Sequence, residues 1–500
     1  MLNFVCIFFA ASVMLAPIFF FTIYFLPEKH ARIQAWMPAL SSGSMFGALL
    51  LMLPFSLKGY IFENSLLQFI PDIKFYFRID LFGLYFGLVT TLIWFIVSIY
   101  SIGYMKDEKN LCRFYCFFVL CLYFTLGIAF SGNLFTLFIF YELVTLCGYP
   151  LIIHEETDEA RKASRKYLYY TLTGDAFVLF SIFMAYRVTG STDIRGAGIN
   201  GIWDMFDFYL LMIFTILGFV VKASLMPLHG WVADAHPAAP SPASAILSGV
   251  LVNVGIFGMA RIFYNIIGHQ ILIWSKFSMF LLPVVFYTII AASVIALNQN
   301  NLKRRLAYST IGQLSYIVFG LLLANENGIT GGLVHIANHA LMKGTLFLCA
   351  GVIIKETGIK NISDMKGVAK RVPITMIVFT IAALGMIGTP PLCGFISKWT
   401  LGVGALDANK PLYIAVLLAS SLLAAGYFLP IIFIAFFQKQ DIEKLIAGPE
   451  KWYKECDRHM LISIITGGIL IILFGIYVLF PGSPFDLSSR IAKLWTQIPK

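Results

Sequence analysis

The chain has 500 residues, of which 59% are hydrophobic and only 12% are charged. Soluble proteins are about 25% charged, so this composition excludes a soluble enzyme and indicates a chain that lies mostly in a lipid bilayer. Lys and Arg number 36 against 26 Asp and Glu. Such an excess can indicate nucleic-acid binding, but membrane topology explains it here, so we expect no nucleic-acid partner.

Apolar runs of about twenty residues recur along the chain, and each is long enough to cross a bilayer as a helix. We predict an all-α integral membrane protein with about 14 transmembrane helices. The first run lacks the charged start and cleavage site of a signal peptide, so we interpret it as a permanent helix. In chain order the predicted spans are 3–26, 36–57, 81–105, 113–130, 134–153, 167–187, 207–227, 241–265, 274–297, 306–324, 331–354, 373–403, 411–437 and 460–480.

The loops between these spans differ in their content of Lys and Arg. The odd-numbered loops hold 22 of these residues, whereas the even-numbered loops hold 8 and the C-terminal tail holds 3. Basic residues are retained on the cytoplasmic side of a membrane. The pattern predicts that both termini lie on the outer face of a prokaryotic cytoplasmic (inner) membrane.

The chain lacks the motifs that hold redox cofactors, nucleotides or structural metals. None of its eight cysteines forms the Cys-x-x-Cys pair that iron–sulfur and zinc sites prefer. It contains no Gly-x-x-x-x-Gly-Lys-[Ser/Thr] loop and no dinucleotide fingerprint. We therefore expect no cofactor, no metal and no catalytic redox site within this chain.

Four charged residues inside the apolar spans are singled out, because a charge that faces lipid is strongly disfavoured there. They are Glu142, Lys222, Lys343 and Lys398. Such residues normally line a polar interior and mark ion pathways, so each is a candidate functional residue. A structural ion pair is the alternative for any one of them, but four together favour a pathway.

Two aspartates, Asp80 and Asp175, lie nearer the ends of predicted spans. For each we expect helix capping or a local salt bridge.

The predicted span 331–354 carries three titratable side chains on one face. His335, His339 and Lys343 are four residues apart, which makes a stripe about 12 Å long on a helix. Histidine titrates near neutrality and burial makes a lysine release its proton more readily, so the stripe is typical of a proton relay. Two histidines can also bind a metal, but no carboxylate or cysteine accompanies them and the lysine would repel the ion.

Two spans that carry a buried lysine are interrupted by Pro and Gly. Lys222 lies five residues before Pro227, and Lys398 lies seven residues after Pro391. We predict discontinuous helices near Pro227 and Pro390. One broken span in each half of the chain is the pattern of transporters with inverted repeats, whose ion sites lie at the interruptions. A kinked helix without a transport role is the alternative, which the two lysines disfavour.

Several motifs together resemble one family of membrane subunits. They are YSIGYM at 100–105, LHGW at 228–231, DAHP at 234–237, LAYST at 306–310, HALMK at 339–343 and GFISK at 394–398. The chain resembles the antiporter-like subunits shared by respiratory complex I, Mrp-type sodium/proton antiporters and group 4 membrane-bound hydrogenases. The resemblance covers residues 80–400. Because the chain ends about twenty residues after its last predicted span, it looks like the mid-sized subunits rather than the largest one.

The resemblance implies two inverted five-helix repeats of helices 4–8 and 9–13. The expected divisions are 1–112 for helices 1–3, 113–265 for the first repeat, 274–437 for the second, and 438–500 for the last loop, helix 14 and a tail. Each repeat would hold half of a channel, with a polar axis joining the halves at mid-membrane.

By motif position, Glu142 and Lys222 match the family's charge pair, and Glu142 would face a neighbouring antiporter-like subunit. His335, His339 and Lys343 match the connecting relay, and Lys398 matches its terminal residue. One position departs from the pattern, since many relatives carry a lysine or histidine where this chain has Asn253. An amide cannot titrate, so the relay there would need bridging water. His229 and Lys303 are candidates for an access or auxiliary role.

These observations predict a proton-translocating membrane subunit of a multi-subunit redox-driven pump of the complex I or hydrogenase type. Its partners would be other membrane subunits, protons and the lipid bilayer. A D-type subunit of an Mrp-type antiporter, which exchanges protons for Na⁺ or another monovalent cation, is the alternative, although the sequence shows no oxygen cluster assignable to a cation. A purely structural membrane subunit is the third interpretation, and it leaves the buried charges unexplained.

Overall fold

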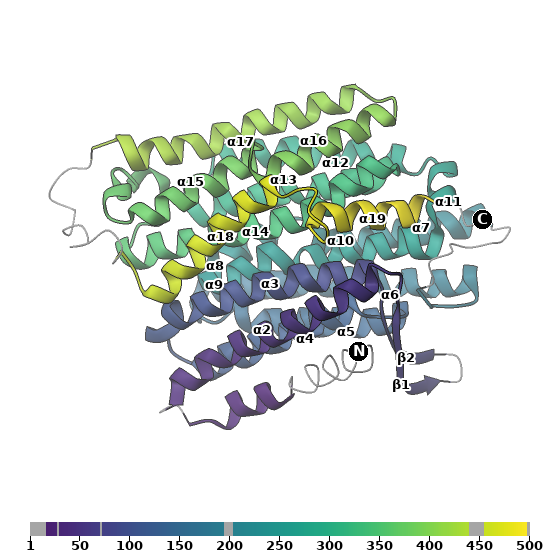
Figure 1. The fold of residues 1–500 in the computed structure, drawn as a ribbon, viewed down its shortest axis with the longest axis horizontal. Helices are drawn as coiled ribbons and strands as arrows, with labels where there is room; N and C mark the ends of the chain where they lie inside the picture. The colour runs from purple at the N-terminus through teal and green to yellow at the C-terminus, as the bar shows by residue number, and fades with distance from the viewer. Residues whose placement is uncertain (1–16, 28–29, 71–72, 195–203, 440–454, 498–500) are drawn as a thin grey trace.

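The computed structural model describes residues 17–27, 30–70, 73–194, 204–439 and 455–497. Almost all of them are helical, and the long helices run nearly parallel to one another (Figure 1). The labelled elements are α2 (Ala31–Ser56), β1 (Phe62–Ile70), β2 (Ile73–Ile79), α3 (Leu81–Tyr104), α4 (Leu111–Ala129), α5 (Leu134–Ile152), α6 (Asp158–Thr189), α7 (Met205–Ala223), α8 (Val232–Ala238), α9 (Ser241–Ile246), α10 (Asn253–Ala260), α11 (His269–Trp274), α12 (Ser278–Leu297), α13 (Leu302–Leu323), α14 (Glu326–Thr357), α15 (Pro373–Ile387), α16 (Cys393–Asp407), α17 (Leu412–Phe437), α18 (Arg458–Ile476) and α19 (Pro484–Thr496). Two π-helical segments, Leu247–Leu251 and Arg261–Ile267, flank α10.

The predicted class, a multi-pass integral membrane protein, is confirmed. Twelve helices in the described part of the chain are long and apolar enough to cross a membrane. The first predicted span, 3–26, lies mostly outside the described residues, and 17–25 of it is helical. The predicted span 373–403 is divided between α15 and α16, which have 15 residues each. The predicted division into two inverted repeats stays a prediction.

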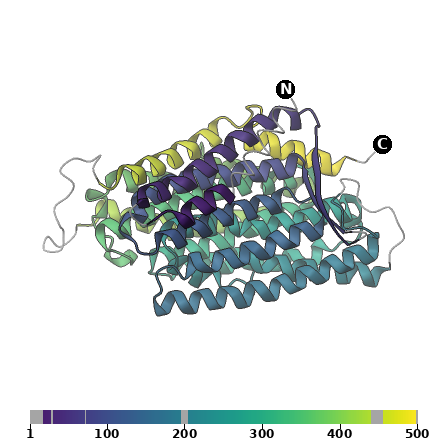
Figure 2. The ribbon, with the colours of Figure 1, turned by 90° about the horizontal axis from the view of Figure 1, so that it is seen from below.

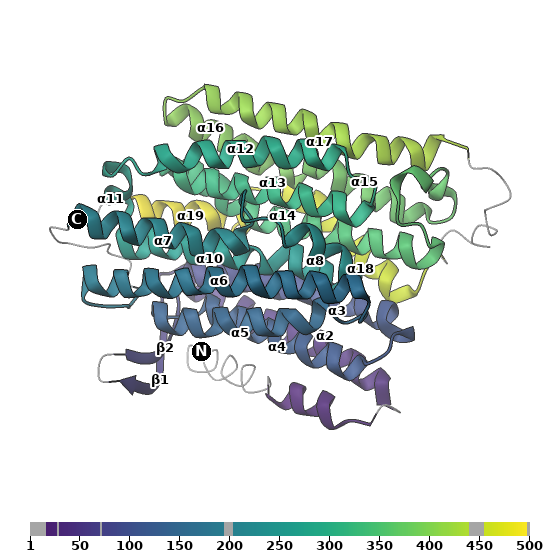
Figure 3. The same cartoon turned by 180° about the vertical axis from the view of Figure 1, so that it is seen from behind.

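The bundle is built around α14. The apolar stretches of α14 and of the helical region 241–267 are completely buried, whereas only 33% of the apolar stretch of α17 is buried, as expected of a helix that faces lipid. The view from below shows the helices stacked in layers (Figure 2), and from behind α6 lies alongside α7 (Figure 3). Where α13 crosses α14, a Cβ added to Gly320 would lie 2.5 Å from the Gly328 carbonyl oxygen, so glycine permits the close approach.

Both predicted interruptions are present. The chain leaves α7 and re-enters a helix at α8 around Pro227, and it leaves α15 and begins α16 around Pro390. The last carbonyl groups of a helix have no partner within that helix. At bilayer depth these groups need other donors, such as protein side chains or water. The interruptions therefore place polar backbone where the buried lysines lie.

The end of the chain differs from the prediction. The predicted last span, 460–480, stops at Ile476 in α18, and the predicted tail forms a further helix, α19. Pro481 and Gly482 lie in the turn between them. The charges of α19 include Arg490 and Lys493, and a search for apolar runs does not detect a helix of this kind.

A β-hairpin was also not predicted. β1 and β2 pair antiparallel, and β2 continues onto the loop between α4 and α5 through hydrogen bonds from Arg78 N to Phe130 O (2.7 Å) and from Gly132 N to Tyr76 O (2.8 Å). The sequence does carry a strand signal here, because apolar residues alternate along IKFYFRI at 73–79. The segment is too short and polar to be a span, so the apolar runs do not indicate it.

One buried ion pair fastens α3 to the helical region 241–267. Arg261 is 1% exposed, and its guanidinium donates to both carboxylate oxygens of Asp80, at 2.5 and 2.8 Å. Asp80 also caps α3 by accepting a hydrogen bond from Gly83 N at 2.8 Å. The expected capping and salt bridge are thus both present, although the ionic partner is 181 residues away.

We predict that Arg261→Met destabilises the folded chain by about 3 kcal/mol, because it leaves the Asp80 carboxylate without its partner. The measurement is the free energy of unfolding of the detergent-solubilised protein. The double variant Asp80→Asn/Arg261→Met should recover most of the loss. Arg161→Ala, which breaks an exposed pair with Asp158 (3.8 Å), is the control and should have no measurable effect. A single variant as stable as the wild type would show that the pair does not hold these helices.

Candidate functional site

Lys222 lies at the end of α7, directly before the interruption. Its side chain is 3% exposed, and its ammonium group donates hydrogen bonds to Asp175 Oδ1 (3.1 Å) and to the Tyr141 carbonyl oxygen (3.0 Å). The ammonium also lies 3.1 Å from the centre of the Tyr141 ring, a cation–π contact. Ser224 adopts a left-handed conformation with φ of +60°, which turns the chain away immediately after the lysine.

Asp175 is the direct ionic partner of Lys222, and the sequence did not predict this. The structure extends α6 to Asp158, so Asp175 lies in mid-helix rather than near a helix end. It is 1% exposed and accepts a second hydrogen bond from Thr145 Oγ1 at 2.8 Å. The expected local salt bridge is therefore a buried bridge between α6 and α7. The first turns of α6 are polar, so the sequence analysis did not include them in the predicted span. Asp175 was therefore expected nearer a helix end than it is.

Glu142 lies further from Lys222 than Asp175 does. It is half-buried on α5 and makes no ion pair with Lys222 within 4 Å. Its carboxyl group interacts electrostatically with Asp175 and with Lys222. Glu142, Asp175 and Lys222 therefore form a group of three titratable side chains on α5, α6 and α7.

The predicted stripe on α14 is present and fully buried. His335 Nδ1 lies 2.7 Å from Ser397 Oγ, and the rings of His335 and His339 are stacked with their centres 6.2 Å apart. Lys343 donates hydrogen bonds to the Leu306 carbonyl oxygen (2.9 Å) and to Ser309. Because Ser397 precedes Lys398 in the chain, the stripe ends next to the second buried lysine.

Lys398 lies on α16, beside the second interruption. Its ammonium group donates to the carbonyl oxygens of Met386 and Ile387, both at 2.9 Å, and to Ser421 Oγ at 3.0 Å. No carboxylate lies within ion-pairing distance of it among the described residues. The two halves of the molecule therefore hold their lysines differently, with a carboxylate for Lys222 and neutral oxygens for Lys398.

Asn253 lies at the start of α10. α10 packs on α7, since a Cβ added to Gly255 would be 3.1 Å from Lys222 Cβ. The preceding π-helical segment packs on α14, where a Cβ on Gly249 would be 3.0 Å from the carbonyl oxygen of Ala340. Asn253 donates to Gly249 O at 2.7 Å, but its Oδ1 has no partner among the described residues. π-Helical turns are frequent at functional sites.

A histidine that the sequence analysis did not single out joins this centre. His236, on α8, is fully buried and interacts electrostatically with His339, Lys343 and Lys303. Neither of its ring nitrogens has a hydrogen-bond partner among the described residues, and the same is true of His339. Its presence in the DAHP motif at 234–237 was the signal that could have identified it.

The two auxiliary candidates lie towards the predicted inner side. Lys303, at the start of α13, is 6% exposed and donates to the Ala239 carbonyl oxygen at 2.9 Å. Its electrostatic neighbour is Glu155. His229 is only partly buried, between α7 and α8, with its ring 6.3 Å from that of Tyr308.

Buried polar atoms without protein partners are concentrated along this axis, and in the described part of the chain they include Asn253 Oδ1, Gln313 Oε1 and the nitrogens of His236 and His339. Buried polar groups are almost always hydrogen-bonded, and ordered water supplies the bond where protein does not. We therefore expect water molecules to bridge the titratable groups along this axis. No group of three or more His, Cys, Asp or Glu that could hold a metal occurs among the residues that the structure describes.

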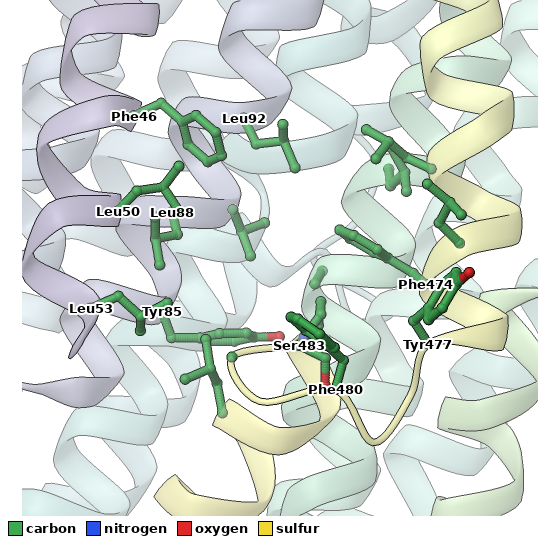
Figure 4. A pocket seen from close by; sticks show the side chains of 18 of the residues that line it. Phe46, Leu50, Leu53, Tyr85, Leu88, Leu92, Phe474, Tyr477, Phe480 and Ser483 are labelled. Atoms are coloured by element: carbon green, nitrogen blue, oxygen red, sulfur yellow. The ribbon is translucent and has the colours of Figure 1, made fainter. Parts of the chain in front are cut away.

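An apolar groove of about 390 Å³ lies away from these groups, between α2, α3 and α18 (Figure 4). Phe46, Leu88 and Phe474 are among its lining side chains, and no charged side chain lines it. It is thus separate from the buried charges, although it reaches α14 at Ala337 and Leu341.

Comparison with known proteins identifies the family. Residues 131–424 match the family described as NADH:quinone oxidoreductase/Mrp antiporter, transmembrane, and residues 70–115 match the family described as NADH-ubiquinone oxidoreductase (complex I), chain 5 N-terminus. The chain belongs to this family of antiporter-like membrane subunits.

Relatives come from three kinds of complex. NADH-quinone oxidoreductase subunit N of Desulforudis audaxviator is 32% identical over 78% of this chain and 80% of its own length. Hydrogenase-4 component B of Escherichia coli is 29% identical over 64% of this chain and 50% of its own length. The D-type subunit of a Na⁺/H⁺ antiporter of Bacillus subtilis is 27% identical over 72% of this chain and 73% of its own length.

Two solved structures share the fold over almost the whole chain. A chain of the membrane-bound sulfane sulfur reductase, an archaeal respiratory membrane complex, superposes with a TM-score of 0.86 at 25% identity. A chain of the Mrp complex from Dietzia sp. superposes with a TM-score of 0.84 at 20% identity. In both cases 98% of each chain is covered.

The geometry predicts which carboxyl group is coupled to Lys222. A double-mutant cycle on the free energy of unfolding, with Asp175→Asn and Lys222→Met, should give a coupling energy of about 1–3 kcal/mol. The matched cycle with Glu142→Gln and Lys222→Met should give a clearly smaller value, because Glu142 does not contact the lysine directly. Equal coupling energies in the two cycles, or a larger one for Glu142, would contradict the assignment.

Proposed function

We propose that this chain moves protons across the membrane as the antiporter-like subunit of a multi-subunit, redox-driven complex. The observation that carries the proposal is the buried series of titratable groups that runs from Glu142, Asp175 and Lys222 along α14 to Lys398. Ionisable residues in the hydrocarbon region are costly and mark proton pathways. A purely structural subunit would have no use for such a series.

The relatives support a redox-driven complex in particular. Subunit N of NADH-quinone oxidoreductase and component B of hydrogenase-4 are both named as parts of oxidoreductases. The sulfane sulfur reductase, which shares the fold, is described as a respiratory membrane complex. The redox chemistry would belong to partner subunits, and this chain would supply the proton path without a cofactor of its own.

In the proposed mechanism the carboxyl groups of Asp175 and Glu142 control the proton affinity of Lys222. When Asp175 is ionised it stabilises the protonated lysine, and when it takes up a proton that stabilisation is lost. An opposite charge about 4 Å away is worth about 4 kcal/mol at an effective dielectric of about 20. This energy changes a protonation equilibrium about a thousandfold, which is sufficient to release the proton of Lys222.

The released proton would then cross to the second half of the molecule. Asn253 and bridging water would carry it from Lys222 towards His339, since the amide itself cannot titrate. His335, His339 and Lys343 would pass it along α14 to Lys398. Lys303 and His236 would form the branch that admits protons from the predicted inner side, because His236 interacts with both Lys303 and Lys343.

Two surface features support partner membrane subunits. Glu142 is a half-buried carboxyl group on a membrane-spanning helix, and lipid alone would not solvate it. Pro390 and Pro391 are exposed at the second interruption, although irregular backbone facing lipid is not found in the hydrocarbon region. A neighbouring antiporter-like subunit would cover such positions. We further propose a prokaryotic cytoplasmic membrane with both termini on the outer face, because of the distribution of Lys and Arg.

A second candidate function is that of the D-type subunit in a monovalent cation/proton antiporter. The similarity to such a subunit of the Bacillus subtilis Na⁺/H⁺ antiporter favours it. The same buried residues would then carry protons against the cation. Identification of the co-purifying subunits by mass spectrometry separates the two candidates, since only the redox-driven complex contains iron–sulfur or hydrogenase subunits.

We predict that Lys222→Ala, and separately Glu142→Ala, abolishes proton translocation while leaving the complex assembled. The reason is that the first variant removes the proton carrier and the second removes the group that controls it. The measurement is proton uptake by sealed vesicles containing the complex, normalised to its amount. Lys162→Ala, at an exposed position of α6, is the matched control and should translocate protons as the wild type does. Wild-type translocation by either buried variant would refute the assignment.

A further inference from the structure

Four buried lysines in the described part of the chain, Lys222, Lys303, Lys343 and Lys398, differ in the oxygens that surround their ammonium groups. Lys222 has a carboxylate partner, Asp175. Lys343 has one carbonyl oxygen and one hydroxyl, and Lys303 has one carbonyl oxygen. Lys398 has three oxygens, and all of them are neutral. This difference makes the surroundings of Lys398 a ready-made set of cation ligands.

The two carbonyl groups come from the last turn of α15. The carbonyls of Leu384 and Gly385 are satisfied by the N–H groups that follow the helix, from Gly388 and Thr389. Met386 O and Ile387 O have left the helical hydrogen-bonding pattern, and Lys398 donates to both at 2.9 Å. They also lie at the negative end of the helix dipole, which favours a cation.

A third element completes the cluster. Ser421, on α17, contributes Oγ at 3.0 Å from the ammonium nitrogen. The Tyr316 hydroxyl on α13 lies beside the Ser420 and Ser421 side chains, and it makes no hydrogen bond of good geometry with the described residues. The centre of the Tyr316 ring is 5.2 Å from Lys398 Nζ, so the ring also lies against the ammonium group.

We propose that these oxygens, from Met386, Ile387 and Ser421, form a binding site for a monovalent metal cation, which the protonated Lys398 occupies as a tethered ammonium group. This inference rests on the proposed function in one respect, namely that Lys398 releases its proton during the cycle. A neutral amine carries no charge and donates two hydrogen bonds instead of three. Release of the proton therefore leaves the helix end without its cation and one oxygen without its donor.

A metal cation can then take the place of the charge. One proton leaves Lys398 for water and one monovalent cation enters the oxygen cluster, so the net charge of the site is unchanged. Unwound carbonyls at the C-terminal ends of broken helices coordinate Na⁺ in transporters of other folds. Rings of carbonyl oxygens bind K⁺ in the same way by replacing its water shell. The distances around Lys398 suit an ammonium-sized ion, and therefore K⁺ better than Na⁺.

The binding of ²²Na⁺ and of ⁸⁶Rb⁺, a stand-in for K⁺, to the purified complex tests the proposal. The wild type should bind little at pH about 5, where the protonated Lys398 holds the site, and at least tenfold more at pH about 10, where the lysine has lost its proton. Lys398→Ala should bind the cation already at the lower pH, because the oxygens remain and the ammonium is gone. Ser421→Ala in that background should weaken binding at least threefold.

Lys343→Ala is the matched control, since it also removes a buried ammonium group but leaves only two oxygens. At each pH it should bind no more cation than the wild type does. No gain of binding in Lys398→Ala, or an equal gain in Lys343→Ala, overturns the proposal. If Lys398→Ala fails to assemble, the wild type at the higher pH is compared with Ser421→Ala, and equal binding by the two also overturns it. Cation binding is measured without turnover, so its failure is distinguishable from a failure of the chain to translocate protons.

Discussion

Each of the buried lysines described above is held by a backbone carbonyl oxygen that belongs to a different helix or to an earlier segment. Tyr141 O serves Lys222, Ala239 O serves Lys303, Leu306 O serves Lys343, and Met386 O with Ile387 O serve Lys398. A bare ammonium group in hydrocarbon is too costly to persist, so the fold must supply these acceptors. The interruption after α15 supplies these acceptors for Lys398, and the neighbouring helices α5 and α13 supply them for Lys222 and Lys343.

The two lysines beside the interruptions are held in different ways. A carboxylate from α6 holds Lys222, so the proton affinity of this lysine depends on the charge of Asp175 and of Glu142. At α15 only neutral oxygens are added, so Lys398 is held by dipoles that do not change. In the proposed function, a switchable site at Lys222 and a fixed site at Lys398, joined by the histidines of α14, would give the proton path its direction.

Much of the fold and some of the site could be predicted from the sequence. The apolar runs predicted the membrane class, and Pro227 and Pro390 predicted the interruptions, because hydrophobicity and Pro/Gly punctuation are local signals. The i, i+4, i+8 spacing of His335, His339 and Lys343 predicted one buried face of α14, again from local geometry.

Asp175 was misplaced because the polar first turns of α6 concealed the length of the helix. The ionic partner of Arg261 lies 181 residues away in the sequence, and no local sequence pattern predicts a contact over that separation. The oxygens around Lys398 could not be found, because they depend on how α15, α16 and α17 pack.

The central claim is that protons cross the molecule through the buried histidines of α14. The most direct test is proton translocation by sealed vesicles that contain the complex with His339→Leu, which removes the titratable ring at the centre of the axis and leaves Lys222 and Lys398 in place. The account predicts that translocation is lost while the subunits remain assembled. Translocation at the wild-type level with an assembled complex would contradict it, because a path that does not need His339 would not be the one described.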